Sequence, residues 1–155
     1  MKLKVDYVVT ATGGGGTYAG LLLGKKMLNQ NYKILGFNVS RPAEDAIKLI
    51  LKHARAACKK YKQLDVKLRK RDVTIVDGYI GRGYAISRPE EIELLKEVAL
   101  KEALVLDPVY TGKTMFGLRD QIKKGLMKKG SKILFLHTGG LFGLFPQKDL
   151  FSFNY

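Results

Sequence analysis

Short apolar runs alternate with longer amphipathic stretches along the whole chain. Apolar runs of strand length occupy residues 5–11, 33–39, 73–76, 104–106 and 132–136. Between them, apolar residues recur at helical spacing and predict helices over residues 18–29, over a long stretch after Ser40, from Pro89 to about Ala103, and over residues 114–127. This alternation predicts a single α/β domain with an open, mostly parallel sheet flanked by helices.

Polar residues mark the expected starts of two helices. Ser40 is placed to cap the second helix, whose apolar face includes Cys58. The run Ser87-Arg88-Pro89-Glu90 has the spacing of a capping box with proline in the first turn. At the other end of the chain, apolar residues 141–145 are expected to form a final packed turn.

Four successive glycines lie between the first strand and the first helix, flanked by Thr12 and Thr17. Because Gly13, Gly14, Gly15 and Gly16 have no β-carbon, their backbone amides can approach an anion closely, and the helix that follows adds partial positive charge. The threonine hydroxyls add two donors. A flexible glycine turn without a ligand is the alternative. Because ordering four glycines costs conformational entropy that a plain turn would not offset, we expect a phosphate or carboxylate site.

The loop alone leaves several phosphate ligands open. Residues 14–19 match the dinucleotide pattern G-x-G-x-x-A, but the second strand ends without a carboxylate to hold a ribose hydroxyl. The run Gly112-Lys113-Thr114 is no Walker loop, because Asp107 occupies the position that requires glycine. A small phosphorylated cofactor fits better than either nucleotide type.

Three further segments follow predicted strands: the loop with Tyr84, the turn with Tyr110, and the turn with Thr138. Ligands of open parallel sheets bind at the carboxyl ends of strands, so these segments can converge with the glycine loop on one rim. Ordinary rim aromatics are the alternative interpretation of the two tyrosines. His137 is interpreted as a structural residue at a strand end rather than as a base.

The chain is basic, with a formal net charge of +14. Residues 52–71 hold nine basic side chains against Asp65 alone, which a solvated helix face followed by a linker explains. Nucleic acid or an acidic partner remains possible on charge alone. With Tyr61 as its one stacking aromatic, the segment disfavours nucleic-acid binding.

Length and composition set further limits. At 155 residues and 46% hydrophobic, the chain can bury the core of one compact domain. Its start does not resemble a signal peptide, and no apolar stretch reaches the ~20 residues of a membrane span. The single cysteine, Cys58, excludes a disulfide framework and a cysteine zinc site, so we expect a reducing cytoplasm and no metal.

Four motifs, in order along nearly the whole chain, resemble one family. They are residues 12–20 (TGGGGTYAG), Gly83-Tyr84, residues 107–113 (DPVYTGK) and residues 137–140 (HTGG). Together they resemble the D-cysteine desulfhydrase and 1-aminocyclopropane-1-carboxylate deaminase family. Its members are pyridoxal 5′-phosphate enzymes of fold type II, related to the tryptophan synthase β subunit, and typically dimers of much longer chains.

The resemblance implies a role for each matching residue. Residues 12–17 would bind the cofactor phosphate, and Tyr84 and Tyr110 would be catalytic tyrosines beside a small amino-acid substrate. Thr111 and Thr138 would lie near the cofactor, where the deaminase branch carries glutamate and leucine and the desulfhydrase branch carries hydroxyl residues. A hydroxyl keeps the pyridine nitrogen nearer neutral than a carboxylate does, which still suffices for β-elimination. The implied reaction removes the α-proton of D-cysteine, expels sulfide and yields pyruvate and ammonia.

The resemblance also identifies what this sequence lacks. In the family, a lysine within an Asn-Lys-x-Arg type motif of the amino-terminal half forms the Schiff base with the cofactor, and no such motif occurs here. Lys113 is the one lysine inside a shared motif and is a poor substitute. We therefore expect a cofactor-binding lobe that is incomplete alone and needs a complementary amino-terminal half or a homodimer, or else a non-catalytic binding module.

Overall fold

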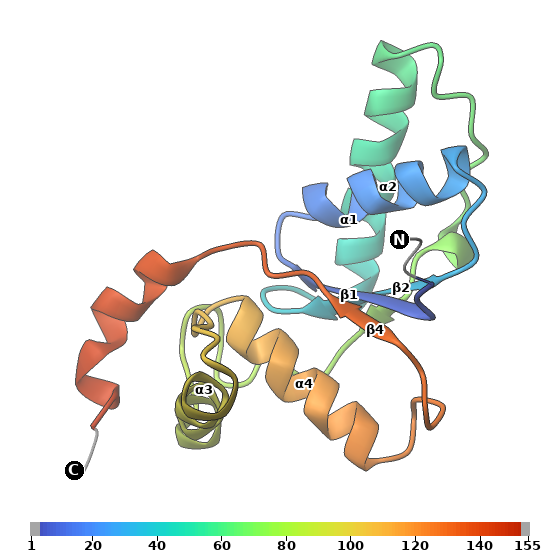
Figure 1. The fold of residues 1–155 in the computed structure, drawn as a ribbon. Coiled ribbons are helices and arrows are strands. Elements are labelled where there is room, and N and C mark those ends of the chain that lie inside the picture. Colours follow the sequence, from blue (N-terminus) through green and yellow to red (C-terminus); the bar gives the residue numbers. More distant parts are fainter. Residues whose placement is uncertain (1–3, 153–155) are drawn as a thin grey trace.

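Four parallel strands form one sheet between two layers of helices in the computed structural model, which describes residues 4–152 (Figure 1). The strands are β1 (Tyr7–Thr12), β2 (Lys33–Asn38), β3 (Ile75–Val76) and β4 (Ile133–Phe135), in the order β3-β2-β1-β4. The helices are α1 (Gly16–Met27), α2 (Ala43–Lys60), α3 (Pro89–Glu102) and α4 (Thr111–Lys123), with 3₁₀ helices η1 (Lys70–Asp72) and η2 (Leu141–Leu150). The predicted α/β class with an open parallel sheet is confirmed.

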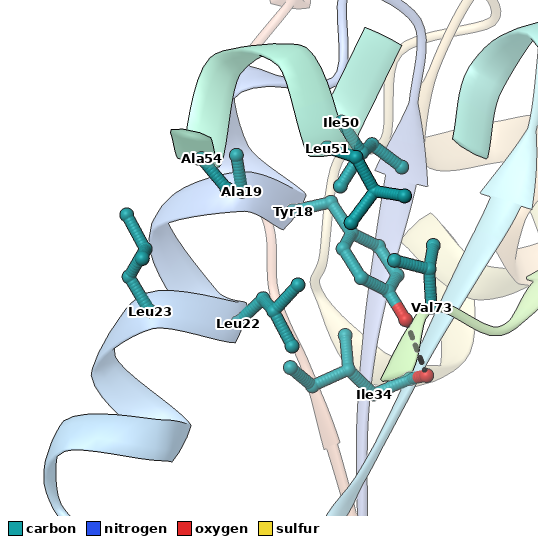
Figure 2. Close-up of a cluster of buried hydrophobic side chains, with 9 residues drawn as sticks. All are labelled: Tyr18, Ala19, Leu22, Leu23, Ile34, Ile50, Leu51, Ala54 and Val73. Atoms are coloured by element: carbon teal, nitrogen blue, oxygen red, sulfur yellow. Dashed lines mark hydrogen bonds between the residues drawn. The ribbon is translucent and has the colours of Figure 1, made fainter. Parts of the chain in front are cut away.

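Helices α1 and α2 cover one face of the sheet and α4 covers the other, with α3 packed on α4 (Figure 1). On the first face, Tyr18 is buried among leucine and isoleucine side chains of α1, α2 and β2 and against Val73, which precedes β3 (Figure 2). Its hydroxyl donates to the Ile34 carbonyl at 3.1 Å and accepts the Thr74 amide at 2.8 Å. One tyrosine thereby joins the helix that follows the glycine loop to both β2 and the segment entering β3.

The opposite face has a smaller core made by Val9, Phe37, Tyr79 and Leu118. Helix α4 lies directly on it, because Gly117 has no side chain: a β-carbon there would lie 2.6 Å from the Phe37 ring. This close approach fixes the start of α4 relative to the ends of β1 and β2, where the candidate site lies.

Residues 104–106 do not form the predicted strand. Their backbone is irregular, and the Val105 carbonyl is contacted by Nε2 of His137 at 2.9 Å instead of by a neighbouring strand. Among the described residues, no backbone hydrogen bond joins this run to a neighbouring strand.

The predicted cap of α2 is wrong, and the predicted capping box of α3 is shifted by one residue, although Pro89 does lie in its first turn. Helix α2 begins after Pro42, not at Ser40, and its first amide, Ala43 N, donates to the Asp77 carboxylate at 3.3 Å. Helix α3 begins after Arg88, whose amide donates to Glu91 at 2.8 Å. The hydroxyl of Ser87 instead donates to Gln147 of η2 at 2.6 Å.

The final apolar residues are not packed as a turn. They belong to η2, where Phe142 is 84% exposed and Phe145 is 69% exposed. Figure 1 shows η2 projecting from the body of the protein beyond α3. An apolar segment is therefore exposed in the described structure. The local sequence pattern does not predict this exposure.

The basic stretch matches its interpretation as a helix face and linker. Helix α2 ends at Lys60, and residues 61–69 connect it to η1 without a helix or strand. Most of these side chains are exposed, and Lys70 pairs with Glu44 at 2.6 Å on the surface. No helix within residues 4–152 is both long and apolar enough to cross a bilayer.

Candidate functional site

The glycine loop turns sharply from the end of β1 into α1. Gly15 precedes the helix with φ at 79°, in the left-handed region that favours glycine. A β-carbon there would lie 3.1 Å from Cγ1 of Ile50 in α2. Nε2 of His53, one turn further along α2, contacts the Gly14 carbonyl at 3.1 Å. Helix α2 thus holds the loop from behind.

The other side of the loop is open. A β-carbon at Gly14 or Gly16 would meet nothing within 4 Å. The first intrahelical bond runs from the Ala19 amide to the Gly15 carbonyl at 2.9 Å, so the preceding amides of the first turn have no partner inside the helix. An anion at this helix start would meet free N–H groups and the positive end of the helix dipole.

A cavity of about 330 Å³ lies in front of the loop. It is lined by the glycine loop and the start of α1, by Tyr110, and by the turn after β4; the lining residues are Ala11, Gly13, Gly14, Gly15, Gly16, Thr17, Tyr18, Tyr110, Thr138, Gly139 and Gly140. The structure therefore brings the glycine loop, Tyr110 and Thr138 to one rim. In the described part of the chain, no lysine lines this cavity.

Tyr84 reaches the site through Tyr110. The two hydroxyls are hydrogen-bonded, and the rings meet edge to face with centroids 5.9 Å apart. This hydrogen bond, together with burial and the charge of Asp107, raises the pKa of Tyr110 to about 12. Tyr110 is therefore protonated at neutral pH, and the phenol pair can hold or pass a proton beside the cavity.

Asp107 fixes the position of Tyr110. This fully buried carboxylate accepts the amides of Val109, Tyr110 and Thr111 at 2.7–2.8 Å and the Thr111 hydroxyl at 2.6 Å. It thereby caps the start of α4. A β-carbon at Gly140, in the turn after β4, would lie 2.8 Å from the Asp107 carboxyl carbon, so the two turns pack directly on each other.

Two predicted cofactor residues do not line the cavity. The Thr12 side chain is buried near Gly36 of β2, and its hydroxyl has no hydrogen-bond partner within the described residues. The Thr111 hydroxyl is fully buried, donates to Asp107 and accepts the Asp107 amide at 2.9 Å. Thr111 thus shapes the Tyr110 turn, and cofactor contacts by either threonine stay predictions.

Two residues support the site without having been predicted from the sequence: Asp107 caps α4, and His53 holds the glycine loop. An aspartate just before a helix is a recognised cap signal and was available in the DPVYTGK motif. No local signal marks His53, which lies 39 residues from Gly14 in the basic stretch. His137 contacts Val105 and accepts the Gly139 amide at 3.2 Å, as a structural residue would. No cluster of three potential metal ligands occurs within residues 4–152.

Known proteins match nearly all of this chain. Residues 1–139 match the family described as pyridoxal-phosphate dependent enzyme. A proposed 1-aminocyclopropane-1-carboxylate deaminase of Pyrococcus abyssi is 43% identical over 145 residues, covering 94% of this chain and 42% of that protein. The D-cysteine desulfhydrase of Klebsiella pneumoniae is 36% identical over 143 residues, covering 92% and 42%.

A solved structure agrees with the fold. The crystal structure of an ACC deaminase homologue matches with a TM-score of 0.82 at 36% identity, covering 96% of this chain and 44% of that one. The chain thus spans less than half the length of the relatives it matches. By sequence and by fold, it belongs to the pyridoxal-phosphate dependent enzymes, in the 1-aminocyclopropane-1-carboxylate deaminase and D-cysteine desulfhydrase family.

Proposed function

We propose that this chain is the phosphate-binding lobe of a D-cysteine desulfhydrase-like lyase, which converts D-cysteine to pyruvate, sulfide and ammonia. The observation that carries the proposal is the shared cavity of the glycine loop, Tyr110 and Thr138. Its loop presents free helix-start amides on the side where Gly14 and Gly16 leave open space. The lone Cys58 supports a reducing cytoplasm as the place of this activity.

The residues present fit pyridoxal 5′-phosphate. A volume of about 330 Å³ suits a small ligand, and the open glycine loop suits its phosphate. Gly13, Gly14, Gly15, Gly16 and Thr17 would hold that phosphate, with Thr138 beside the ring. When bound, the cofactor supplies an electron sink for the negative charge that develops at the substrate α-carbon.

Tyr84 and Tyr110 would donate and transfer protons beside the substrate. Tyr110 keeps its phenol proton at neutral pH and lies at the cavity wall, so it can donate a hydrogen bond to substrate or to a departing group. Tyr84 is about half exposed and hydrogen-bonded to Tyr110, so it offers a path for that proton to reach solvent. Asp107 holds the pair in place through the Tyr110 amide.

We further propose that a complementary amino-terminal polypeptide completes the enzyme. The support is that the chain covers 42–44% of its relatives, and that no lysine lines the cavity within the described residues. An apolar cavity of about 460 Å³ between α3 and η2, bordered by exposed Phe145, offers a surface for that polypeptide. A homodimer is the second arrangement that would cover it.

Two other functions remain as candidates. The Pyrococcus relative favours aminocyclopropane-carboxylate deamination, whereas the uncharged hydroxyl of Thr138, which lines the cavity, favours the desulfhydrase. The absence of a lysine from the cavity lining in the described part favours a non-catalytic binding module. Each candidate shares the same phosphate site.

One set of measurements separates them. The chain alone should gain thermal stability from pyridoxal 5′-phosphate, yet borohydride should fix no pyridoxyl label on any lysine. A polypeptide that comprises the residues preceding the matched region of a relative is then added to the chain. The mixture should release sulfide from D-cysteine faster than it releases ammonia from aminocyclopropane-carboxylate. Binding without turnover would support the non-catalytic module. Absence of any stabilisation by the cofactor would overturn the proposal.

A further inference from the structure

Lys113 is a buried cation that the proposed chemistry does not use. Its side chain is 1% exposed, in the first turn of α4. The ammonium donates to three main-chain carbonyls of one loop: Ile80, Gly83 at 2.6 Å and Ile86 at 3.0 Å. An ammonium has three N–H donors, so this one is fully engaged and is not a free nucleophile.

The loop that receives Lys113 has an unusual backbone. Gly81, Gly83 and Ala85 all have positive φ, at 70°, 143° and 59°. These turns direct several carbonyls toward one point, where they would repel one another without a cation between them. The Lys113 ammonium supplies that cation, as a bound monovalent ion would in a carbonyl cage.

An ion pair between Arg88 and Glu91 packs against the same loop at Gly81. The Glu91 carboxylate is buried and pairs with Arg88 at 2.8 Å, and a β-carbon at Gly81 would lie 3.1 Å from both side chains. Burial lowers the pKa of Lys113, and the Glu91 charge opposes that effect. The Arg88 charge adds to the lowering, so Glu91 compensates the buried cation only in part and the three loop carbonyls provide its direct partners.

The loop carries Tyr84 between two residues that Lys113 holds, Gly83 and Ile86. The partner of Tyr84 is Tyr110, which lies immediately before α4 and three residues from Lys113. One lysine thus ties the Tyr84 loop to the helix start that carries Tyr110. From the η2 segment, Gln147 donates to the Ala85 carbonyl at 3.1 Å and accepts the Ser87 hydroxyl at 2.6 Å, so it contacts the loop but not the helix start that carries Tyr110.

We propose that Lys113 is a positioning residue for Tyr84: its ammonium gathers the loop carbonyls so that the Tyr84 hydroxyl meets that of Tyr110. The catalytic meaning of this role rests on the proposed function of the tyrosine pair, but the geometric claim does not. Lys113 acts through the loop and touches neither the cavity nor the phosphate site.

The test compares Lys113→Met with Lys101→Met, a surface lysine of α3 paired with Glu97. Tyrosine labelled with ¹³C at Cζ reports on Tyr110 by NMR, with Tyr84→Phe as the reference for a broken pair. In the parent chain and Lys101→Met, ring contacts between Tyr84 and Tyr110 should persist at neutral pH. Tyr110 should be only ~10% ionised at about pH 11, given its pKa near 12.

In Lys113→Met, the ring contacts should disappear, and the ionised fraction of Tyr110 should rise roughly fivefold, to the Tyr84→Phe value. Lower thermal stability with unchanged tyrosine signals would mean a merely structural lysine and would overturn the proposal. If Lys113→Met does not fold, Lys113→Gln keeps an amide donor and should give intermediate tyrosine signals; signals identical to the parent would equally overturn it.

Cofactor binding is measured on the same samples. Because the glycine loop is separate from the Tyr84 loop, Lys113→Met should keep the stabilisation by pyridoxal 5′-phosphate seen in the parent chain. If the parent chain itself is not stabilised, the proposed function fails while the tyrosine signals still decide the role of Lys113.

Discussion

The ring of Tyr110 lies directly over Gly13, where a β-carbon would come within 3.1 Å of its Cε1 atom. These residues are far apart in sequence, one at the end of β1 and the other just before α4. Because residue 13 is glycine, the Tyr110 ring can lie close to the glycine loop, and both line one cavity. The close contact therefore places two motifs that are distant in sequence on one cavity.

Gly14→Ala should separate ligand binding from folding. The added methyl meets no protein atom within 4 Å, so the free energy of unfolding should change by less than about 0.5 kcal/mol. The methyl would occupy the open side of the loop, and affinity for pyridoxal 5′-phosphate should fall at least tenfold, or about 1.4 kcal/mol. Thermal shifts at several cofactor concentrations measure both quantities.

Gly24→Ala in α1 is the matched control, because its methyl also meets nothing within 4 Å but lies on the helix away from the loop. It should leave cofactor affinity unchanged and stabilise the helix by up to about 1 kcal/mol. Equal affinities of Gly14→Ala and Gly24→Ala for pyridoxal 5′-phosphate would show that the glycine loop does not bind the cofactor.

Asp107→Ala should destabilise the start of α4. It leaves the buried amides of Val109, Tyr110 and Thr111 without their acceptor, which should cost at least about 2 kcal/mol of unfolding free energy in urea titrations. Asp107→Asn retains one carbonyl acceptor and should lose less. A loss of similar size in both variants would point to charge, rather than to amide capping, as the main contribution of Asp107.

The Lys26–Asp72 ion pair, 2.9 Å long, should contribute to stability only above acidic pH. Burial by itself raises the pKa of Asp72, but hydrogen bonds from Lys26 and the Arg69 amide outweigh it and hold the pKa below its usual 3.8. A lowered carboxyl pKa stabilises the folded state above the unfolded pKa, and this gain is lost as pH falls through the folded pKa.

Lys26→Met should therefore cost about 0.2–1 kcal/mol at neutral pH, and the difference from the parent chain should vanish well below pH 3.8. Lys48→Met breaks a far more exposed pair with Asp45 and should have a smaller effect at every pH. Urea titrations across the acid range measure both. A Lys26→Met deficit that persists unchanged into acid would contradict an electrostatic origin.

Phe145→Glu should reduce self-association of the chain. Phe142 and Phe145 are exposed on η2, with tilted rings whose centroids lie 6.1 Å apart, and Phe145 borders the apolar cavity beside α3. Such a patch favours association with itself or with a partner. Sedimentation velocity should show oligomers of the parent chain at high concentration and fewer for Phe145→Glu. A parent chain that stays monomeric would count against an interaction surface here.

The sequence alone was enough to predict most of the helices and strands, their order and the loop that suits a phosphate. Helical and strand periodicity are local properties, and four glycines between a strand and a helix specify an open backbone turn wherever the fold places them. The shared motifs of residues 12–20, 83–84, 107–113 and 137–140 were enough to identify the family, which the fold and the relatives confirm.

The tertiary structure alone decided which side chains meet. Thr12 and Thr111 are next to the site in sequence, yet their hydroxyls point into the protein, because strand pairing and the Asp107 cap set their direction. Tyr84 meets Tyr110 from a distant loop whose carbonyls bind the Lys113 ammonium. These outcomes depend on sheet order, on helix packing through Gly117 and on buried charge, which act between residues far apart and leave no periodic signal in the chain.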